Sequence, residues 1–336
     1  MTSVRRALLL ALLAVAFHVA WLHETRVPRR TAEDPPASLV VSQGASTEAI
    51  GQKLRELDLV GHPLVFRALV RLRGASQRLR AGEYLIEGPV SLEQIVDMLV
   101  RGEVVRRDIT FPEGKVLEDM ADLAALRGLD RAAFLQAAKD PSLVRDLDAD
   151  ATDLEGYLFP DTYDLPRSGT APALVARMVQ RFRAVLEPLQ PRLQSQGLSV
   201  RQAVTLASIV ELETGRVDER PRIAAVFRNR LRQGMPLQTD PTVIYALRKA
   251  RLWDGNIRRK DLEIDSPYNT YRRAGLPPGP IASPGREALL AVLEPAPVKD
   301  LYFVSRNDGS HQFSETLAEH ERAVDRFQRR GRGGRT

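Results

Sequence analysis

The sequence predicts a membrane-anchored α+β protein, in which a small α+β module precedes a mainly helical domain that contains a C-terminal β-hairpin. An apolar run near the N-terminus indicates the anchor. Short β-like runs alternate with helical patterns over residues 39–112, and helical periodicity dominates the rest of the chain. The expected parts are a cytoplasmic stub with transmembrane anchor at 1–24, a linker at 25–38, the module at 39–118, the mainly helical domain at 119–328 and a disordered basic tail at 329–336.

Composition narrows the class of protein. The 336 residues are 43% hydrophobic and 27% charged, an ordinary globular balance. There is no cysteine, so neither a disulfide framework nor a thiolate metal site can form. The formal charge is +6, but the arginines are spread along the chain and aromatics are only 6%, so a membrane or envelope polymer is a better partner than nucleic acid. We expect no cofactor and no metal, because the histidines lack ligand spacing. They are His18, His23, His62, His311 and His320.

The N-terminal segment reads as an export signal. Arg5 and Arg6 precede an uncharged run over 7–22, with Trp21 at the expected membrane interface. At 1.5 Å per residue this run spans about 24 Å, which is short for a spanning helix and long for a signal-peptide core. Cleavage after 14–16 is the alternative. We favour an uncleaved single-pass anchor in the plasma (inner) membrane, with a cytoplasmic N-terminus and the remainder periplasmic or extracytoplasmic.

The module shows a strand–turn–helix pattern twice. Residues 39–57 carry the first copy and residues 109–126 the second. Between them lie a strand at 81–86 and a helix at 91–99, which begins with the Ser-x-x-Gln pattern of a capping box. The unit resembles a LysM-like module, which in other proteins binds glycan chains. A spacer and docking domain is the alternative, since the unit has no aromatic cluster for stacking on sugars.

Residues 199–215 predict one buried helix at the centre of the second domain. Ser199 and Gln202 form a capping-box start, and Gly215 is placed to end the helix in the left-handed conformation. The intervening residues are apolar almost all round, which is typical of a core helix rather than a surface helix.

Two acids lie near the end of this helix. By helical periodicity Glu213 shares a face with Leu206 and Ile209. Glu211 falls on the opposite face, with Ala207. A carboxyl held against aliphatic side chains should have a raised pKa, so Glu213 could donate a proton near neutrality, as a glycosidase acid does. The alternative is that both are ordinary carboxylates, paired with some of the many arginines.

Further segments suggest a binding surface. Residues 153–163 interleave polar turn residues with aromatics, an arrangement suited to stacking on sugar rings, although by itself the pattern is unspecific and a packed loop is the default interpretation. Asp240 before Pro241 predicts a helix N-cap without any function. Residues 265–284 are too rich in proline for regular structure and too aromatic for a disordered linker, so we expect an ordered functional loop. Residues 307–309 predict a hairpin turn.

Four motifs in this order resemble one known family. They are the runs 207–214, 237–242, 268–271 and 275–279, and together they are similar to the MltG/YceG family of membrane-anchored endolytic murein transglycosylases. The resemblance covers nearly the whole chain. It implies a lysozyme-like helical core and a lytic transglycosylase activity. That activity cleaves the MurNAc-β-1,4-GlcNAc bond of nascent peptidoglycan strands, leaves a 1,6-anhydro-MurNAc end and terminates strand elongation.

In this family the catalytic acid is the second glutamate of a Glu-x-Glu-Thr motif, which is Glu213 here. The resemblance also implies peptidoglycan strands, the cytoplasmic membrane and peptidoglycan synthases of elongation or division as partners. The candidates for holding the glycan are Gln238, Thr239, Asp240, Asn269, Tyr271, Phe159 and Asp161.

Two other classes of function stay open at this point. The chain could be a non-catalytic glycan-binding scaffold of the wall-synthesis machinery. It could also be a two-carboxylate muramidase in which Asp161 or Asp240 is the partner of Glu213.

Overall fold

The computed structural model describes residues 2–105, 108–165 and 169–329. The chain divides into two compact units. The first comprises Met1–Arg107 with Asp164–Ser168, and the second comprises Asp108–Tyr163 with Gly169–Thr336. The class is mixed α+β with mostly helical content, as predicted. The basic tail expected at 329–336 lies, beyond Arg329, outside the described residues.

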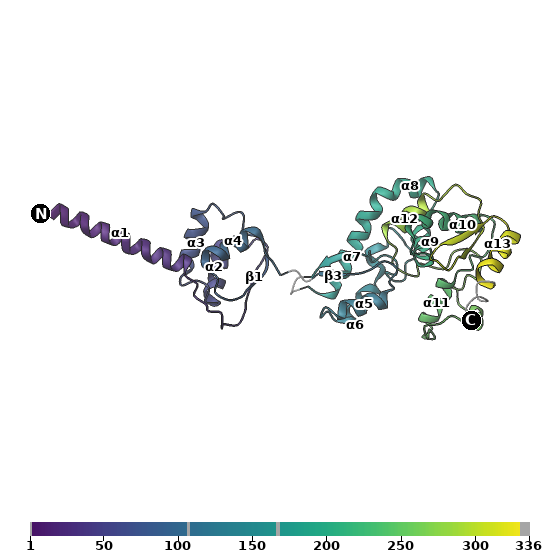
Figure 1. The fold of residues 1–336 in the computed structure, drawn as a ribbon, viewed down its shortest axis with the longest axis horizontal. Helices are drawn as coiled ribbons and strands as arrows, with labels where there is room; N and C mark the ends of the chain where they lie inside the picture. The colour runs from purple at the N-terminus through teal and green to yellow at the C-terminus, as the bar shows by residue number, and fades with distance from the viewer. Residues whose placement is uncertain (1, 106–107, 166–168, 330–336) are drawn as a thin grey trace. The chain divides into compact units, whose positions relative to one another are not determined.

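In the first unit, helices pack on a two-stranded antiparallel sheet (Figure 1). Leu39 of one strand lies opposite Tyr84 of the other, and both side chains are buried in the core. Helix α4 begins with the predicted capping box. A helix at 63–72 was not anticipated. The elements are α1 (Thr2–Arg26), β1 (Ala37–Val41), α2 (Thr47–Glu56), α3 (Pro63–Leu72), β2 (Gly82–Ile86) and α4 (Leu92–Arg101).

Helix α1 is long and apolar enough to cross a membrane. Its segment Arg5–Arg26 has a mean hydropathy of 1.8. The last turn packs on the module, where Trp21 contacts the core and Arg26 pairs with Glu93 at 3.1 Å. The segment expected to be a free linker is attached to the module as well, since Arg29 pairs with Asp58 at 3.2 Å. Part of the segment predicted as a linker is therefore held against the module, through Arg26 and Arg29.

The second unit holds most of the helices. Its elements are β3 (Asp108–Thr110), α5 (Leu117–Ala125), α6 (Arg131–Ala138), η1 (Pro141–Val144), β4 (Thr162–Asp164), α7 (Ala171–Leu186), η2 (Glu187–Leu189), α8 (Gln190–Ser195), α9 (Val200–Glu213), η3 (Val217–Glu219), α10 (Arg220–Arg232), α11 (Asp240–Lys249), η4 (Arg259–Glu263), α12 (Arg286–Leu293), β5 (Tyr302–Ser305), β6 (His311–Ser314), α13 (Leu317–Val324) and η5 (Asp325–Arg329). The boundary lies at 107/108 rather than at 118/119, because β3 pairs with β4 and Phe111 is buried in this unit.

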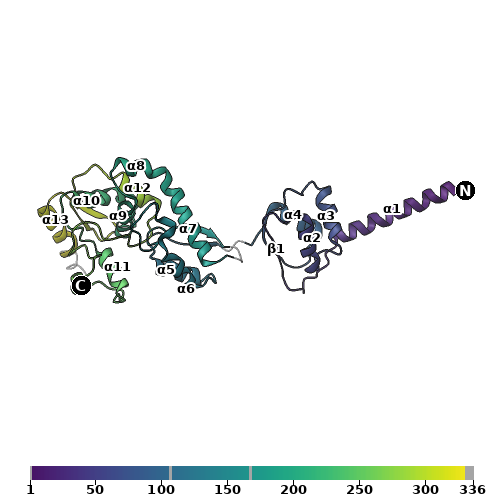
Figure 2. The same ribbon diagram turned by 180° about the vertical axis from the view of Figure 1, so that it is seen from behind.

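Helix α9 is the centre of the second unit, as its apolar sequence predicted. Figure 1 and Figure 2 show α10 and α12 beside it, and every residue from Ala203 to Glu211 is buried. The β5–β6 hairpin forms as expected, with Asn307 and Gly309 in the left-handed conformation that its turn requires. This packing fixes the direction in which the C-terminal turn of α9 presents its two acids.

Candidate active site

The two ends of α9 form by different means. Ser199 and Gln202 make the predicted capping box at the start. At the other end Thr214 leaves the helix in an extended conformation, and Gly215 does not adopt a positive φ. The left-handed ending predicted for Gly215 is therefore wrong. The Thr214 hydroxyl instead accepts a hydrogen bond from the Arg216 N–H at 3.0 Å, which turns the chain sharply after Glu213.

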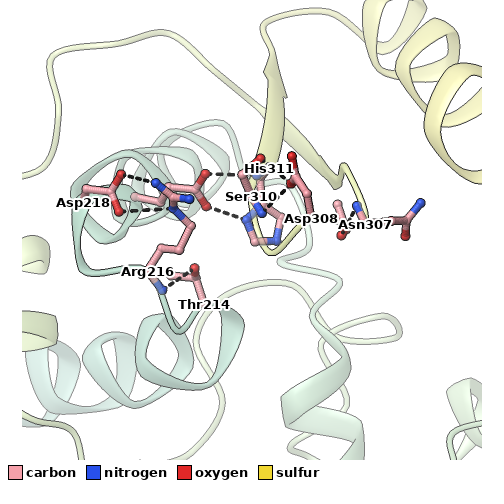
Figure 3. A network of polar contacts seen from close by, with 9 residues as sticks. Thr214, Arg216, Asp218, Asn307, Asp308, Ser310 and His311 are labelled. Atoms are coloured by element: carbon pink, nitrogen blue, oxygen red, sulfur yellow. Dashed lines mark hydrogen bonds and ion pairs between the residues drawn. The ribbon is translucent and has the colours of Figure 1, made fainter.

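The segment after this turn is held against the hairpin. Figure 3 shows Arg216 facing Asp218, with two hydrogen bonds of 3.2 and 2.9 Å. Glu219 accepts a hydrogen bond from the backbone N–H of His311 at 3.0 Å and contacts its Nδ1 at 2.6 Å. Both side chains of this second pair are largely buried. The exit of α9 is thus fixed from two sides, so Glu213 sits on a rigid element.

Glu213 is half-buried and makes one hydrogen bond within the described residues. The Thr239 hydroxyl donates to its Oε1, while its Oε2 has no such partner there. Burial raises the pKa of Glu213 to about 7, and the negative charge of Asp240 acts in the same direction. The Thr239 hydrogen bond and the Arg230 charge oppose the rise in pKa. The result is a carboxyl that exchanges a proton near neutrality and has one oxygen available.

Glu211 is in a different position. Its side chain is 5% exposed, and Arg220 donates to its Oε1 at 2.5 Å. The backbone N–H of Gly285 donates to its Oε2 at 2.9 Å. Burial raises the pKa of Glu211 as well, against the effect of these two donors. A raised pKa therefore does not distinguish the two acids. What distinguishes them is that both oxygens of Glu211 are engaged inside the protein, whereas one oxygen of Glu213 is not.

Thr239 is positioned by the proline-rich loop. It is 2% exposed, and its backbone N–H donates to the hydroxyl of Thr270 at 3.2 Å. The preceding residue, Gln238, is exposed and has a φ of 52°, which is uncommon for a residue other than glycine. Its N–H donates to the Thr270 carbonyl at 3.1 Å. Left-handed non-glycine residues often mark functional sites, and this one directly precedes the residue that holds Glu213.

Asp240 does not cap α11. Helix α11 begins at Asp240 itself, and its N-cap is Thr239, without a side-chain cap. The predicted capping role is therefore wrong. Instead, Asp240 accepts a hydrogen bond from the Tyr271 hydroxyl at 2.6 Å. The carboxylate is fixed beside Glu213, where its charge raises the pKa of that acid.

Three other candidate residues have different surroundings. Asn269 is fully buried, and its amide donates to the carbonyls of Leu262 and Ile264 at 2.9 and 2.8 Å. It therefore shapes the loop that carries Thr270 and Tyr271. Phe159 is buried beneath the Arg181 guanidinium, and Asp161 pairs with Arg181 at 2.7 Å. No contact that the structure gives for these two residues, among the described ones, reaches Glu213.

Arg230 was not among the residues predicted from the sequence to belong to the site. This side chain is 8% exposed, and its guanidinium donates to the carbonyls of Leu301 and Leu237 at 2.7 and 2.9 Å. Its charge lowers the pKa of Glu213. In the sequence Arg230 is one of several arginines on an amphipathic helix. Only its contact with the backbone just before Gln238, which the sequence does not show, distinguishes it from the other arginines. Within the described residues, no group of three or more potential ligands is placed to hold a metal ion.

The fold and this geometry place one carboxyl with a raised pKa and an available oxygen at the end of the central helix. The chain belongs to the YceG-like family, whose model matches residues 39–326. An endolytic murein transglycosylase of Bacillus subtilis is 33% identical over 304 residues, covering 85% of this chain and 83% of that protein. One of Streptococcus pneumoniae is 31% identical over 316 residues, covering 84% of this chain and 57% of that protein. The crystal structure of a yceG-like protein of Listeria monocytogenes matches with a TM-score of 0.61 and 32% identity, covering 85% of this chain and 98% of that one.

Proposed function

We propose that this protein is an endolytic murein transglycosylase in which Glu213 is the catalytic acid and base. The observation that carries the proposal is the state of this carboxyl. One oxygen is held by Thr239, the other is available, and the pKa is about 7. The names of the relatives give the same activity.

The chemistry requires one carboxyl that acts twice. Protonated Glu213 gives its proton to the glycosidic oxygen, and the bond from that oxygen to C1 of MurNAc breaks. The C6 hydroxyl of the same sugar then attacks C1, and its proton passes to the Glu213 carboxylate. The 1,6-anhydro ring closes, no water is consumed and the acid is regenerated. A pKa near the working pH suits both transfers.

The neighbouring residues have supporting roles in this proposal. Thr239 holds Oε1 and so orients the carboxyl. Asp240, fixed by Tyr271, raises the pKa, and Arg230 limits that rise. Gln238 and Tyr271 are proposed to contact the glycan, and Asn269 to support it through the loop.

Incubation of the protein with purified peptidoglycan strands, followed by analysis of the products, tests the proposal. The full-length chain should release 1,6-anhydro-MurNAc ends, detected by mass spectrometry, and the Glu213→Gln chain should release none. A reducing MurNAc end would instead identify a two-carboxylate muramidase. Strands that bind without being cleaved would identify a scaffold.

We also propose a location for the chain and a role for each unit. Helix α1 is retained as a single-pass anchor, and the parts of both units that follow it lie outside the cytoplasm, where nascent strands and their synthases are found. The first unit is a LysM-like targeting module, and the second has a lysozyme-like core and cleaves strands that are still being elongated. A mature N-terminus at Phe17 in the native protein would refute the retained anchor. A folded chain beginning at Asp108 that fails to cleave strands would refute the division of roles.

A further inference from the structure

A cavity of about 730 Å³ lies in the second unit, apart from Glu213. It is lined by the N-terminal turn of α5, by α6, and by the C-terminal end of α11 with the residues that follow it. Tyr245 and Trp253 supply aromatic surface, and Glu155 lies in its wall. Cavities of this size commonly hold ligands. The role proposed for Glu213 leaves this cavity without a function.

Glu155 is an unusual residue to find in such a wall. It is 4% exposed, and its Oε2 accepts hydrogen bonds from the Leu117 N–H at 3.4 Å and the Tyr245 hydroxyl at 3.2 Å. Its Oε1 is buried and has no hydrogen-bond partner among the residues that the structure describes. Burial raises the pKa of Glu155 to about 8. A buried carboxyl oxygen without a partner destabilises the fold, and such groups are concentrated at binding and catalytic sites.

The charges that line the cavity are unbalanced. Its cations are Arg131, Lys139, Arg248, Lys249 and Arg251, and its carboxylates other than Glu155 are Glu118, Asp119 and Asp153. Arg248 is paired with Asp119 at 3.0 Å, and Lys249 lies over the Tyr245 ring. Lys139 and Arg251 are exposed and form no ion pair with the residues that the structure describes. Glu118 and Asp153 likewise form no ion pair with the described residues, so the cavity offers two available cations beside two available carboxylates.

We propose that this cavity binds the carboxylate-bearing peptide stem of the strand that Glu213 cleaves, with Lys139 and Arg251 as its anion-binding residues. The proposal rests on the function proposed above. The sugar rings of the backbone are uncharged, whereas a stem carries free carboxylates that match the two cations, and amide groups that can pair with the Glu155 carboxyl.

The separation of the two sites fits this ligand. Asp240, beside Glu213, begins α11, and Lys249, which lines the cavity, ends it. At 1.5 Å per residue these positions are about 13 Å apart along the helix axis. An extended tetrapeptide spans at most about 13–14 Å. A stem attached to the sugar at Glu213 can therefore reach the cavity.

A double variant of the full-length chain, Lys139→Gln with Arg251→Gln, tests the proposal. The quantity measured is the preference for strands with tetrapeptide stems, which is the ratio of their kcat/KM to that of stem-free strands. Loss of two partly exposed charge contacts should lower this ratio roughly five- to thirtyfold. The matched control is Arg127→Gln with Arg145→Gln, which removes two exposed cations of the same unit that do not line the cavity and should leave the ratio unchanged.

A second measurement does not depend on catalysis. Calorimetric titration of the free tetrapeptide should show binding to the wild-type chain and to the control variant, and a loss of affinity in the Lys139→Gln, Arg251→Gln variant. The proposal would be overturned if the Lys139→Gln, Arg251→Gln variant showed the same preference and the same affinity as the control variant. It would also be overturned if the wild-type chain did not bind the peptide. If the wild-type chain cleaves neither kind of strand, the proposed function fails, and the titration still decides whether the cavity binds the stem.

Discussion

Replacing Glu213 by glutamine should abolish turnover and leave α9 in place. The amide keeps the shape of the side chain and can still accept the Thr239 hydrogen bond, but it can neither donate a proton to the glycosidic oxygen nor take one from the C6 hydroxyl. General acid–base assistance is worth ~10²–10⁴ in rate, and here one carboxyl serves both steps, so the loss should reach at least the upper end.

The raised pKa of Glu213 determines how the activity should depend on pH. With a pKa of about 7, about half of the Glu213 side chains carry a proton at pH 7. With the ordinary value of 4.5, about 0.3% would carry one. The environment of Glu213 therefore increases the fraction of side chains that carry a proton about 150-fold at neutral pH. We expect kcat/KM to be level on the acid side of pH 7 and to fall about tenfold per pH unit above it.

The same rise in the pKa of Glu213 predicts how the free energy of unfolding depends on pH. A carboxyl whose pKa is raised on folding gives its full stabilisation below pH 4.5, and that stabilisation is lost as the pH rises through about 7. Relative to wild type, Glu213→Gln should therefore gain about 2–3 kcal/mol of unfolding free energy between pH 4 and pH 8.

The assay combines release of anhydro-muropeptides, followed from pH 5 to pH 9, with thermal melting of both chains. Two results would refute the reasoning: an active Glu213→Gln enzyme that melts normally, or a wild-type pH profile whose midpoint lies at an ordinary carboxyl value.

Three further substitutions test the surroundings of the site. Glu211→Gln breaks the buried pair with Arg220, so it should cost about 3–5 kcal/mol of stability and retain turnover; a stable but inactive variant would contradict this. Asp240→Asn removes a charge that raises the pKa of Glu213, so the alkaline limb of the pH profile should move to lower pH, and an unmoved limb would exclude this role. Glu155→Gln removes a carboxyl whose pKa is raised to about 8, so relative to wild type it should gain about 3–4 kcal/mol of unfolding free energy between pH 4 and pH 8. Equal pH dependence of melting in the two chains would show that Glu155 is not protonated in the fold.

Much of the architecture could be predicted from the sequence because it depends on neighbours within one or two turns. The capping boxes at Ser91 and Ser199 join residues three positions apart, and both form. The hairpin turn at 307–309 depends on residues that tolerate positive φ, and it forms too. Apolar residues all round α9 predicted its burial, because a helix without a polar face must be covered on every side.

The candidate site was predictable only in part. Periodicity places Glu211 and Glu213 on different faces of α9, but it does not show what each face meets. The partners of Glu211 are Arg220, 9 residues away, and Gly285, 74 residues away. The partner of Glu213 is Thr239, 26 residues away. These contacts leave one oxygen available on Glu213 and none on Glu211.

Tertiary packing also decided what Asp240, Arg230 and Glu155 do. From the sequence, Asp240 is interpreted as a helix cap and Arg230 as one of many surface arginines. Glu155 is interpreted as part of an aromatic turn. In the folded chain Asp240 accepts a hydrogen bond from Tyr271, and Arg230 is buried against three carbonyls. Glu155 lies in a cavity wall, with one oxygen that has no hydrogen-bond partner among the described residues. The physical reason is the separation along the chain over which each effect acts. Propensity, capping and periodicity act between near neighbours, whereas pKa shifts and cavities arise from burial by segments that are distant in the chain.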